Sequence, residues 1–246
     1  MQGLPASGGV SLSIPERLAR LDWAEIGDGL DAWGYARTPA LLTPDECAAL
    51  AALYAEDGRF RSRVDMARFR FGVGEYKYFA EPLPEPVAEL RAHAYPPLAA
   101  VANRWEATLG TRVRHPGDLS GLRALCARRG QRKLTPLLLR YAPGGYNCLH
   151  QDIYGDVVFP IQLTVLLSEP GKDFEGGEFM LVEQRPRAQS RGSVVPLAQG
   201  EAVIFTTRYR PVAGARGHYR VTMRHGVSRL LAGERYTLGV IFHDAR

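Results

Sequence analysis

Apolar residues from about residue 135 onward fall into short runs, which are separated by glycine, proline and other turn-forming residues. The runs are rich in β-branched and aromatic residues, and no helix-length pattern lies between them, which favours about six to eight short strands. We expect strands at residues 136–141, 157–167, 178–183, 193–197, 202–207, 218–225 and 235–243. Such a series is typical of a sandwich or a jelly-roll barrel.

The first half of the chain has mainly helical patterning. Thr43 precedes a proline and two acidic residues, as a helix N-cap does, and the Ala- and Leu-rich residues 47–54 continue the helix. A second helix is expected over residues 86–109, where apolar positions recur at helical spacing. Pro96 and Pro97 should break or kink that helix, because proline lacks the backbone N–H that a helix interior needs.

Residues 59–79 lie between these helices and are rich in arginine, phenylalanine, tyrosine and glycine. Their aromatic side chains cluster at Tyr76, Tyr78 and Phe79. The segment is either a loop that faces a substrate or a hairpin that packs on the core, and the hairpin is the more usual outcome.

Length and composition favour one globular domain with a full core, since 46% of the 246 residues are apolar and 23% are charged. We expect an α+β, mainly β protein, in which a mainly helical region (residues 1–134) packs on a β core (residues 135–246). No window is long and apolar enough for a membrane span, and residues 1–14 lack the features of a signal peptide. These observations predict a cytoplasmic protein with no membrane partner.

The cysteines Cys47, Cys126 and Cys148 are too few and too scattered for a disulfide framework or a zinc site. Their scarcity fits a reducing compartment. On a strand, Cys148 would share a face with His150, two residues along, although it is expected to be simply a small buried residue.

The formal net charge is +5, and nearly all the basic residues are arginine. Arginine suits phosphate, carboxylate and base recognition because its planar fork donates two hydrogen bonds at once. A charge of this size does not by itself establish nucleic-acid binding. The arginine-rich segments 185–191 and 208–220 are expected to be solvated loops.

A candidate metal site begins at His150-Gln151-Asp152. On an extended chain the imidazole and the carboxylate point to one side, so both can bind the same ion. His225 is the best candidate for a second imidazole. Two histidines and one carboxylate form a facial triad, which leaves three adjacent coordination positions open for a co-substrate and oxygen.

A candidate anion site follows the second histidine. Arg235 lies ten residues after His225, at the start of an alternating strand, and Thr237 shares its face. An arginine fork with a nearby hydroxyl suits a carboxylate, as the far end of 2-oxoglutarate requires. The remaining histidines, His93, His115 and His243, are expected to be ordinary core or surface residues. For His218, a supporting role near the site is the alternative to such an ordinary role.

The ensemble of these motifs resembles the 2-oxoglutarate/Fe(II) dioxygenases with a double-stranded β-helix, over roughly residues 135–246. The matching segments are Leu139-Arg140-Tyr141-Ala142-Pro143-Gly144-Gly145-Tyr146, His150-Gln151-Asp152, Gly176-Gly177-Glu178-Phe179, Gly200 to Phe205, His225-Gly226-Val227 and Arg235. Their spacing is similar to that of the prolyl-4-hydroxylase-like branch. The resemblance implies a jelly-roll, cupin-like core that uses Fe(II), 2-oxoglutarate and O2. It also implies that Tyr141 hydrogen-bonds the co-substrate, and that Arg235 replaces the lysine usual in prolyl hydroxylases.

Residues 150–187 and 218–244 also resemble a bacterial oxygenase family that is grouped with oxidative demethylases of damaged nucleic acid. AlkB-type repair enzymes differ from this chain, because they place the co-substrate arginine further beyond the distal histidine and add a second arginine shortly after it. Here the position six residues after Arg235 is Ile241.

Three functions remain open. The first is oxidative demethylation or hydroxylation of nucleic acid, and the second is hydroxylation of a protein side chain or a free amino acid. The third, more remote, is a non-catalytic 2-oxoglutarate sensor. The oligomeric state is also open.

Overall fold

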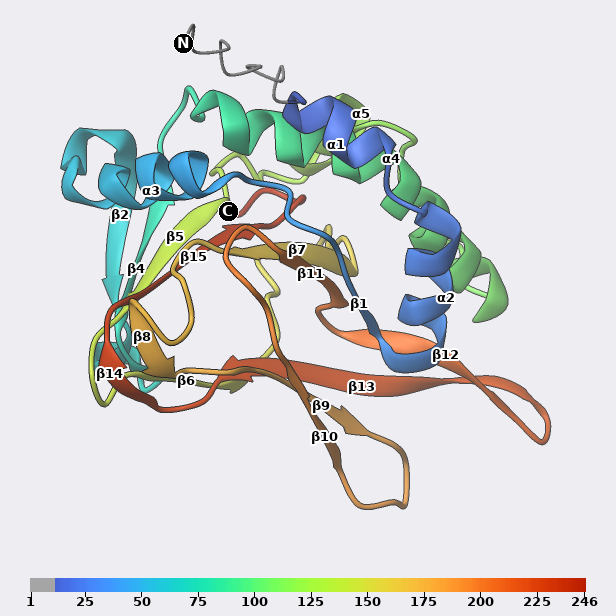
Figure 1. Cartoon of the computed structure of the whole chain (residues 1–246). Coiled ribbons are helices and arrows are strands. Elements are labelled where there is room, and N and C mark those ends of the chain that lie inside the picture. The colour runs from blue at the N-terminus through green and yellow to red at the C-terminus, as the bar shows by residue number, and fades with distance from the viewer. Residues whose placement is uncertain (1–11) are drawn as a thin grey trace, which may run out of the picture.

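The larger of two facing β-sheets contains seven strands in the order β1-β11-β7-β15-β5-β4-β2, and every neighbouring pair is antiparallel (Figure 1). This computed structural model describes residues 12–246. The strands are β1 (Tyr35–Arg37), β2 (Phe60–Asp65), β4 (Glu75–Phe79), β5 (Leu137–Tyr141), β7 (Ile161–Leu166), β11 (Ala202–Thr206) and β15 (Arg235–Val240).

The smaller sheet has the order β10-β9-β13-β6-β3, and β12 pairs with β13 beside this path. Its strands are β3 (Gly72–Val73), β6 (Tyr146–His150), β9 (Phe179–Gln184), β10 (Arg191–Val195), β12 (Tyr209–Gly214) and β13 (Gly217–Val227). A separate two-stranded ribbon contains β8 (Phe174–Gly176) and β14 (Leu230–Gly233).

The helices lie together on the outer side of the larger sheet (Figure 1). They are α1 (Ile14–Ala19), α2 (Trp23–Trp33), α3 (Pro44–Ala52), α4 (Glu85–Thr108) and α5 (Leu119–Arg128), with the short 3-10 turns η1 (Leu53–Ala55) and η2 (Asp57–Arg59). A third 3-10 turn, η3 (Met66–Phe69), lies apart from them, between β2 and β3. Thr43 caps α3 as predicted: its hydroxyl accepts a hydrogen bond from the Glu46 amide, and the Glu46 carboxylate accepts one from the Thr43 amide. No helix within residues 12–246 has the length and apolar character needed to cross a membrane.

Side-chain alternation along the larger sheet produces two cores. On β15, Leu238 and Val240 pack against the helices, whereas Arg235 and Thr237 face the space between the sheets. On β7, Gln162 and Thr164 face that space too, and the alternating Ile161, Leu163 and Val165 face the helices. The centre of the larger sheet is therefore buried on both faces, yet its inner face carries polar groups.

This architecture confirms the predicted α+β, mainly β jelly-roll core with helices packed on it. Each of the seven predicted strand ranges overlaps an observed strand. The loop predicted at residues 208–220 is wrong, because most of it forms β12 and the start of β13. Residues 185–190 do form a loop, between β9 and β10.

Of the break or kink predicted at Pro96 and Pro97, the break is wrong, because α4 continues through both residues as one helix. The two missing N–H groups would have bonded to the carbonyls of Ala92 and His93, which are exposed residues. Water can therefore satisfy those carbonyls, which makes the prolines tolerable on this side of the helix.

Residues 59–79 form the predicted hairpin, in which β2 pairs with β4 at the edge of the larger sheet. The turn between these strands contains η3 and β3, and β3 pairs with β6 in the smaller sheet. The first 134 residues thus contribute strands as well as helices, and the division at residue 134 stays a prediction. Residues 1–11, most of the N-terminus that was predicted to lack a signal peptide, lie outside the described residues.

The packing of helices on the larger sheet predicts that two leucines contribute differently to the free energy of unfolding. Leu238→Ala should lower the free energy of unfolding by about 2–5 kcal/mol, because the fully buried side chain leaves a cavity. Leu231→Ala is the matched control and should change it by less than about 0.5 kcal/mol, since Leu231 is 65% exposed. Urea unfolding measures both, and equal effects would contradict this account of the core.

Candidate metal and anion site

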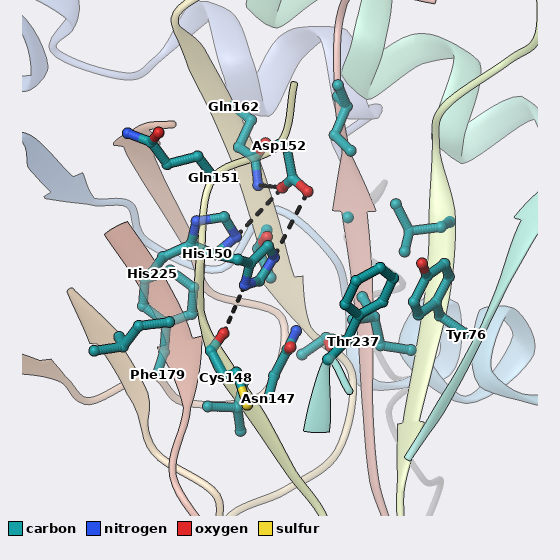
Figure 2. A pocket seen from close by; sticks show the side chains of 18 of the residues that line it. Tyr76, Asn147, Cys148, His150, Gln151, Asp152, Gln162, Phe179, His225 and Thr237 are labelled. Carbon is teal, nitrogen blue, oxygen red and sulfur yellow. Dashed lines mark hydrogen bonds and ion pairs between the residues drawn. The ribbon is translucent and has the colours of Figure 1, made fainter. Parts of the chain in front are cut away.

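A cavity of about 400 Å³ opens between the two sheets (Figure 2). Strands β5, β6, β7, β13 and β15 line it, together with residues that follow β6 and with the turn between β2 and β4. All six predicted site residues lie on its wall: Tyr141, His150, Asp152, His225, Arg235 and Thr237.

His150, Asp152 and His225 meet at one part of this wall. His150 ends β6 and pairs directly with His225 of β13, and Asp152 follows two residues later. The Nε2 atoms of His150 and His225 lie 3.6 and 3.3 Å from the two carboxylate oxygens of Asp152. One donor atom from each residue lies within 4.8 Å of the others, so the three can bind one metal ion.

The His150 ring is held by its own strand. Its Nδ1 donates a hydrogen bond of 2.8 Å to the carbonyl of Cys148, which leaves Nε2 as the ring atom that can bind a metal (Figure 2). Cys148 itself is exposed, so the expectation of a buried cysteine is wrong. The reason is that β6 lies at the open side of the cavity, next to the two-residue strand β3.

Two donors orient the Asp152 carboxylate. The Tyr154 hydroxyl donates to Oδ1 at 2.7 Å, and the Gln162 amide donates to Oδ2 at 2.9 Å. Sequence reasoning did not identify either residue. A signal existed for both, because Tyr154 is two positions after Asp152 and Gln162 interrupts an otherwise apolar run.

The charge state of the triad suits a divalent cation. Burial by itself raises the pKa of Asp152, but hydrogen bonding and charge from His225 outweigh burial, and the pKa lies below its ordinary value. Burial lowers the pKa of His225, and the charge of His150 lowers it further. At neutral pH the site therefore contains a carboxylate and a neutral His225 imidazole, which are the forms that bind metal.

Arg235 forms a second centre in the same cavity. It pairs with Tyr141 across β15 and β5, and its guanidinium carbon lies 5.8 Å from the centre of the Tyr141 ring. Burial lowers the pKa of Arg235 to about 10, so the group stays cationic at neutral pH. Within residues 12–246, neither its Nε and Nη1 atoms nor the buried Tyr141 hydroxyl has a hydrogen-bond partner.

Unpartnered buried donors of this kind are rare, because each lacks the hydrogen bonds that it would make in water. An anion in the cavity would satisfy them, and a carboxylate matches the arginine fork. Thr237 lies on the same face, and its side chain also lines the cavity (Figure 2).

The other histidines lie elsewhere. His93 is exposed on α4, and His218 is exposed near the free end of the β12–β13 hairpin. His115 and His243 are buried outside the cavity wall, and the Nδ1 of His243 accepts a hydrogen bond from the Phe159 amide. These positions fit the ordinary roles expected for them, and His218 has no contact with the triad.

Comparison with known proteins identifies a family whose model matches this chain. Residues 74–245 match the model of the Oxygenase-NA family, described as an "oxygenase, catalysing oxidative methylation of damaged DNA". Two uncharacterized proteins of Mycobacterium tuberculosis, Rv2227 of strain H37Rv and MT2286 of strain CDC 1551, are each 47% identical over 167 residues. The matched region is 68% of this chain and 72% of each relative.

Solved structures share the fold at low sequence identity. A prolyl-4-hydroxylase of Pseudomonas putida has a TM-score of 0.53 and 18% identity, over 91% of this chain and 99% of that one. The non-haem 2-oxoglutarate-dependent epimerase SnoN of nogalamycin biosynthesis has a TM-score of 0.54 and 13% identity, over 90% of this chain and 83% of that one. Proteins of such different activities share this architecture, so the fold alone does not identify a substrate.

The contact between Tyr154 and Asp152 leads to a prediction about metal binding. Tyr154→Phe should weaken binding of Co(II), a spectroscopic substitute for Fe(II), by about 10–100-fold, because Asp152 loses one of its two orienting donors. Tyr95→Phe is the control, since its buried hydroxyl donates to the Pro116 carbonyl, away from the cavity. Absorption titrations measure both affinities, and an equal loss in the two variants would argue against a specific role for Tyr154.

Proposed function

This chain belongs to the Oxygenase-NA family of 2-oxoglutarate/Fe(II) oxygenases, and we propose that it oxidises alkylated nucleic acid with His150, Asp152 and His225 as iron ligands. Family membership confirms the resemblance drawn from the sequence and makes the protein an oxidoreductase that uses Fe(II), 2-oxoglutarate and O2. The matched segment contains the three metal ligands and the three residues that we assign to the co-substrate.

The donor set supports iron at the triad. Two imidazole nitrogens and one carboxylate oxygen are the ligands that non-haem Fe(II) oxygenases use, and all three converge from one side of the cavity. The cavity wall contains no other acidic side chain than Asp152 within residues 12–246. Substrate and co-substrate can then approach the open side of the same ion.

The observation that carries the proposal is the pair of unpartnered donors, Arg235 and Tyr141, in the cavity that also holds the triad. We assign Arg235 and Thr237 to the far carboxylate of 2-oxoglutarate and Tyr141 to a hydrogen bond with the same molecule. A dicarboxylate would give the buried guanidinium the counter-ion that no ion pair within residues 12–246 provides.

Bound iron and 2-oxoglutarate supply the oxidation, in which one atom of O2 enters a substrate C–H bond and 2-oxoglutarate leaves as succinate and carbon dioxide. The protein orients both groups, limits water in the cavity and positions the C–H bond. If that bond belongs to an N-methyl group, the hydroxymethyl product releases formaldehyde and leaves the demethylated base.

Nucleic acid is the substrate class that the family description favours. The exposed Arg70 on the cavity wall gives the site a cationic group suited to phosphate. Hydroxylation of a protein or free amino acid, the alternative drawn from the spacing of His225 and Arg235, is the other outcome of the substrate test below.

The role assigned to Arg235 predicts a selective defect. Arg235→Ala should weaken 2-oxoglutarate binding by about 100-fold, because two charge-assisted hydrogen bonds are lost, and should change Co(II) affinity by less than about threefold. Arg140→Ala is the control, since Arg140 is the neighbour of Tyr141 on β5 and pairs with Glu234 outside the cavity. Calorimetry under anaerobic conditions measures both affinities, and an equal loss of metal and co-substrate binding would refute the assignment.

The substrate proposal predicts which compounds stimulate turnover. Protein reconstituted anaerobically with Fe(II) and 2-oxoglutarate and then exposed to O2 should form succinate and formaldehyde in equal amounts with N-methylated single-stranded DNA. Unmethylated DNA should give no formaldehyde. Succinate formation with a peptide or amino acid pool, together with a +16 mass shift, would instead establish the hydroxylase alternative, and co-substrate binding without succinate for any substrate would indicate a sensor.

A further inference from the structure

Exposed apolar side chains concentrate at the mouth of the cavity. The described part of the chain has ten large apolar side chains that are exposed, and six of them belong to this region: Phe69, Phe71, Val73, Tyr146, Leu149 and Ile153. Phe71, Leu149 and Ile153 line the cavity, and Val73 pairs with Tyr146 across β3 and β6. An exposed apolar patch that is continuous with a cavity indicates a binding surface.

Two aromatic rings form the outer part of this patch. The rings of Phe69 and Phe71 are stacked, with centroids 5.6 Å apart and an interplanar angle of 21°. They are 57% and 48% exposed. Their separation leaves no room for a third ring between them, so a planar ligand would stack on their free faces.

The turn that carries these rings, residues 66–73, is held firmly to the sheets. Met66 is fully buried, and its carbonyl accepts a hydrogen bond from the Phe71 amide. The carbonyl of Phe71 accepts one from the Cys148 amide of β6 at 2.8 Å. Gly72 has a φ of +141°, and a Cβ there would lie 2.3 Å from the Tyr146 carbonyl oxygen. The rings are thus fixed relative to the strand that carries His150.

Positive charge accompanies the rings. Arg68 and Arg70 belong to the same turn, are exposed and form no ion pair with the described residues. The exposed Arg208 lies beside the cavity wall, because the Gln151 amide donates to the backbone carbonyl of Arg208 at 2.8 Å. A mouth with aromatic faces and free guanidinium groups matches the bases and phosphates of a nucleic-acid strand.

We infer that residues 66–73 are a stacking platform for single-stranded nucleic acid, which holds the nucleotides that flank the base in the cavity. Phe69 and Phe71 contact base faces, and Arg68 and Arg70 contact phosphates. The occupant is single-stranded because bases inside a duplex have no free face to offer the rings. The inference rests on the proposed function and adds to it the residues that select the substrate.

Fluorescence anisotropy with a labelled single-stranded oligonucleotide tests the platform. The double variant F69A/F71A of the full chain should bind at least about tenfold more weakly than the wild type, because stacking on both rings is lost. R68Q/R70Q should bind more weakly and lower the slope of log affinity against log salt by about one to two, since two phosphate contacts are removed.

Matched controls exist elsewhere on the surface. Trp33→Ala removes an aromatic side chain that is 53% exposed, and Arg129→Gln removes an exposed arginine of the helical layer, both outside the cavity. Both should bind like the wild type. Circular dichroism checks that each variant is folded, and a salt-independent loss in all four variants would overturn the inference.

The platform and the proposed function can fail separately. If methylated DNA stimulates succinate formation but F69A/F71A and R68Q/R70Q bind the oligonucleotide like the wild type, the platform is refuted and the function stands. If the wild type does not bind the oligonucleotide even at low salt, and a peptide or amino acid stimulates succinate formation, both are refuted.

Discussion

A buried guanidinium without a counter-ion of its own is the constraint on which the site depends. The chain pairs its other fully buried arginines, since Arg91 lies 2.6 Å from Asp244 and Arg210 lies 2.6 Å from Glu183. Arg235 is equally buried, but within residues 12–246 it has no such partner. Burial of an unpaired charge is costly, so this exception is explained if a ligand of the cavity provides the missing anion.

The jelly-roll fold makes that arrangement possible because of how its central strands are covered. Helices bury the outer face of β15 and β7 through Leu238, Val240 and Leu163, and this packing contributes much of the stability. The inner face is thus free to carry polar groups such as Gln162, which orients Asp152. A strand with only one buried face would have exposed these groups to water, where they orient a ligand less strictly.

Sequence reasoning reached the groups whose position follows from strand alternation and from family motifs. His150, Asp152, His225, Arg235 and Thr237 all lie on the cavity wall, as expected. It missed Tyr154 although this residue is two positions after Asp152, because the chain there has left β6 and the spacing alone does not bring the hydroxyl to the carboxylate. It also misjudged Cys148, because the open edge of β6 is a property of the sheet order rather than of the local sequence.

Substrate choice follows from a different part of the molecule than the chemistry does. The nine residues between His225 and Arg235 span one strand end, β14 and a turn, so this spacing determines the position of Arg235, to which we assign the co-substrate. This spacing does not determine which substrate enters the cavity. The mouth of the cavity is formed by the turn between β2 and β4 and by the residues after β6. A hydroxylase and an epimerase share the fold, so the fold alone does not determine the substrate. In this chain that region presents stacked phenylalanine rings and unpaired arginines, and we therefore assign substrate recognition to it.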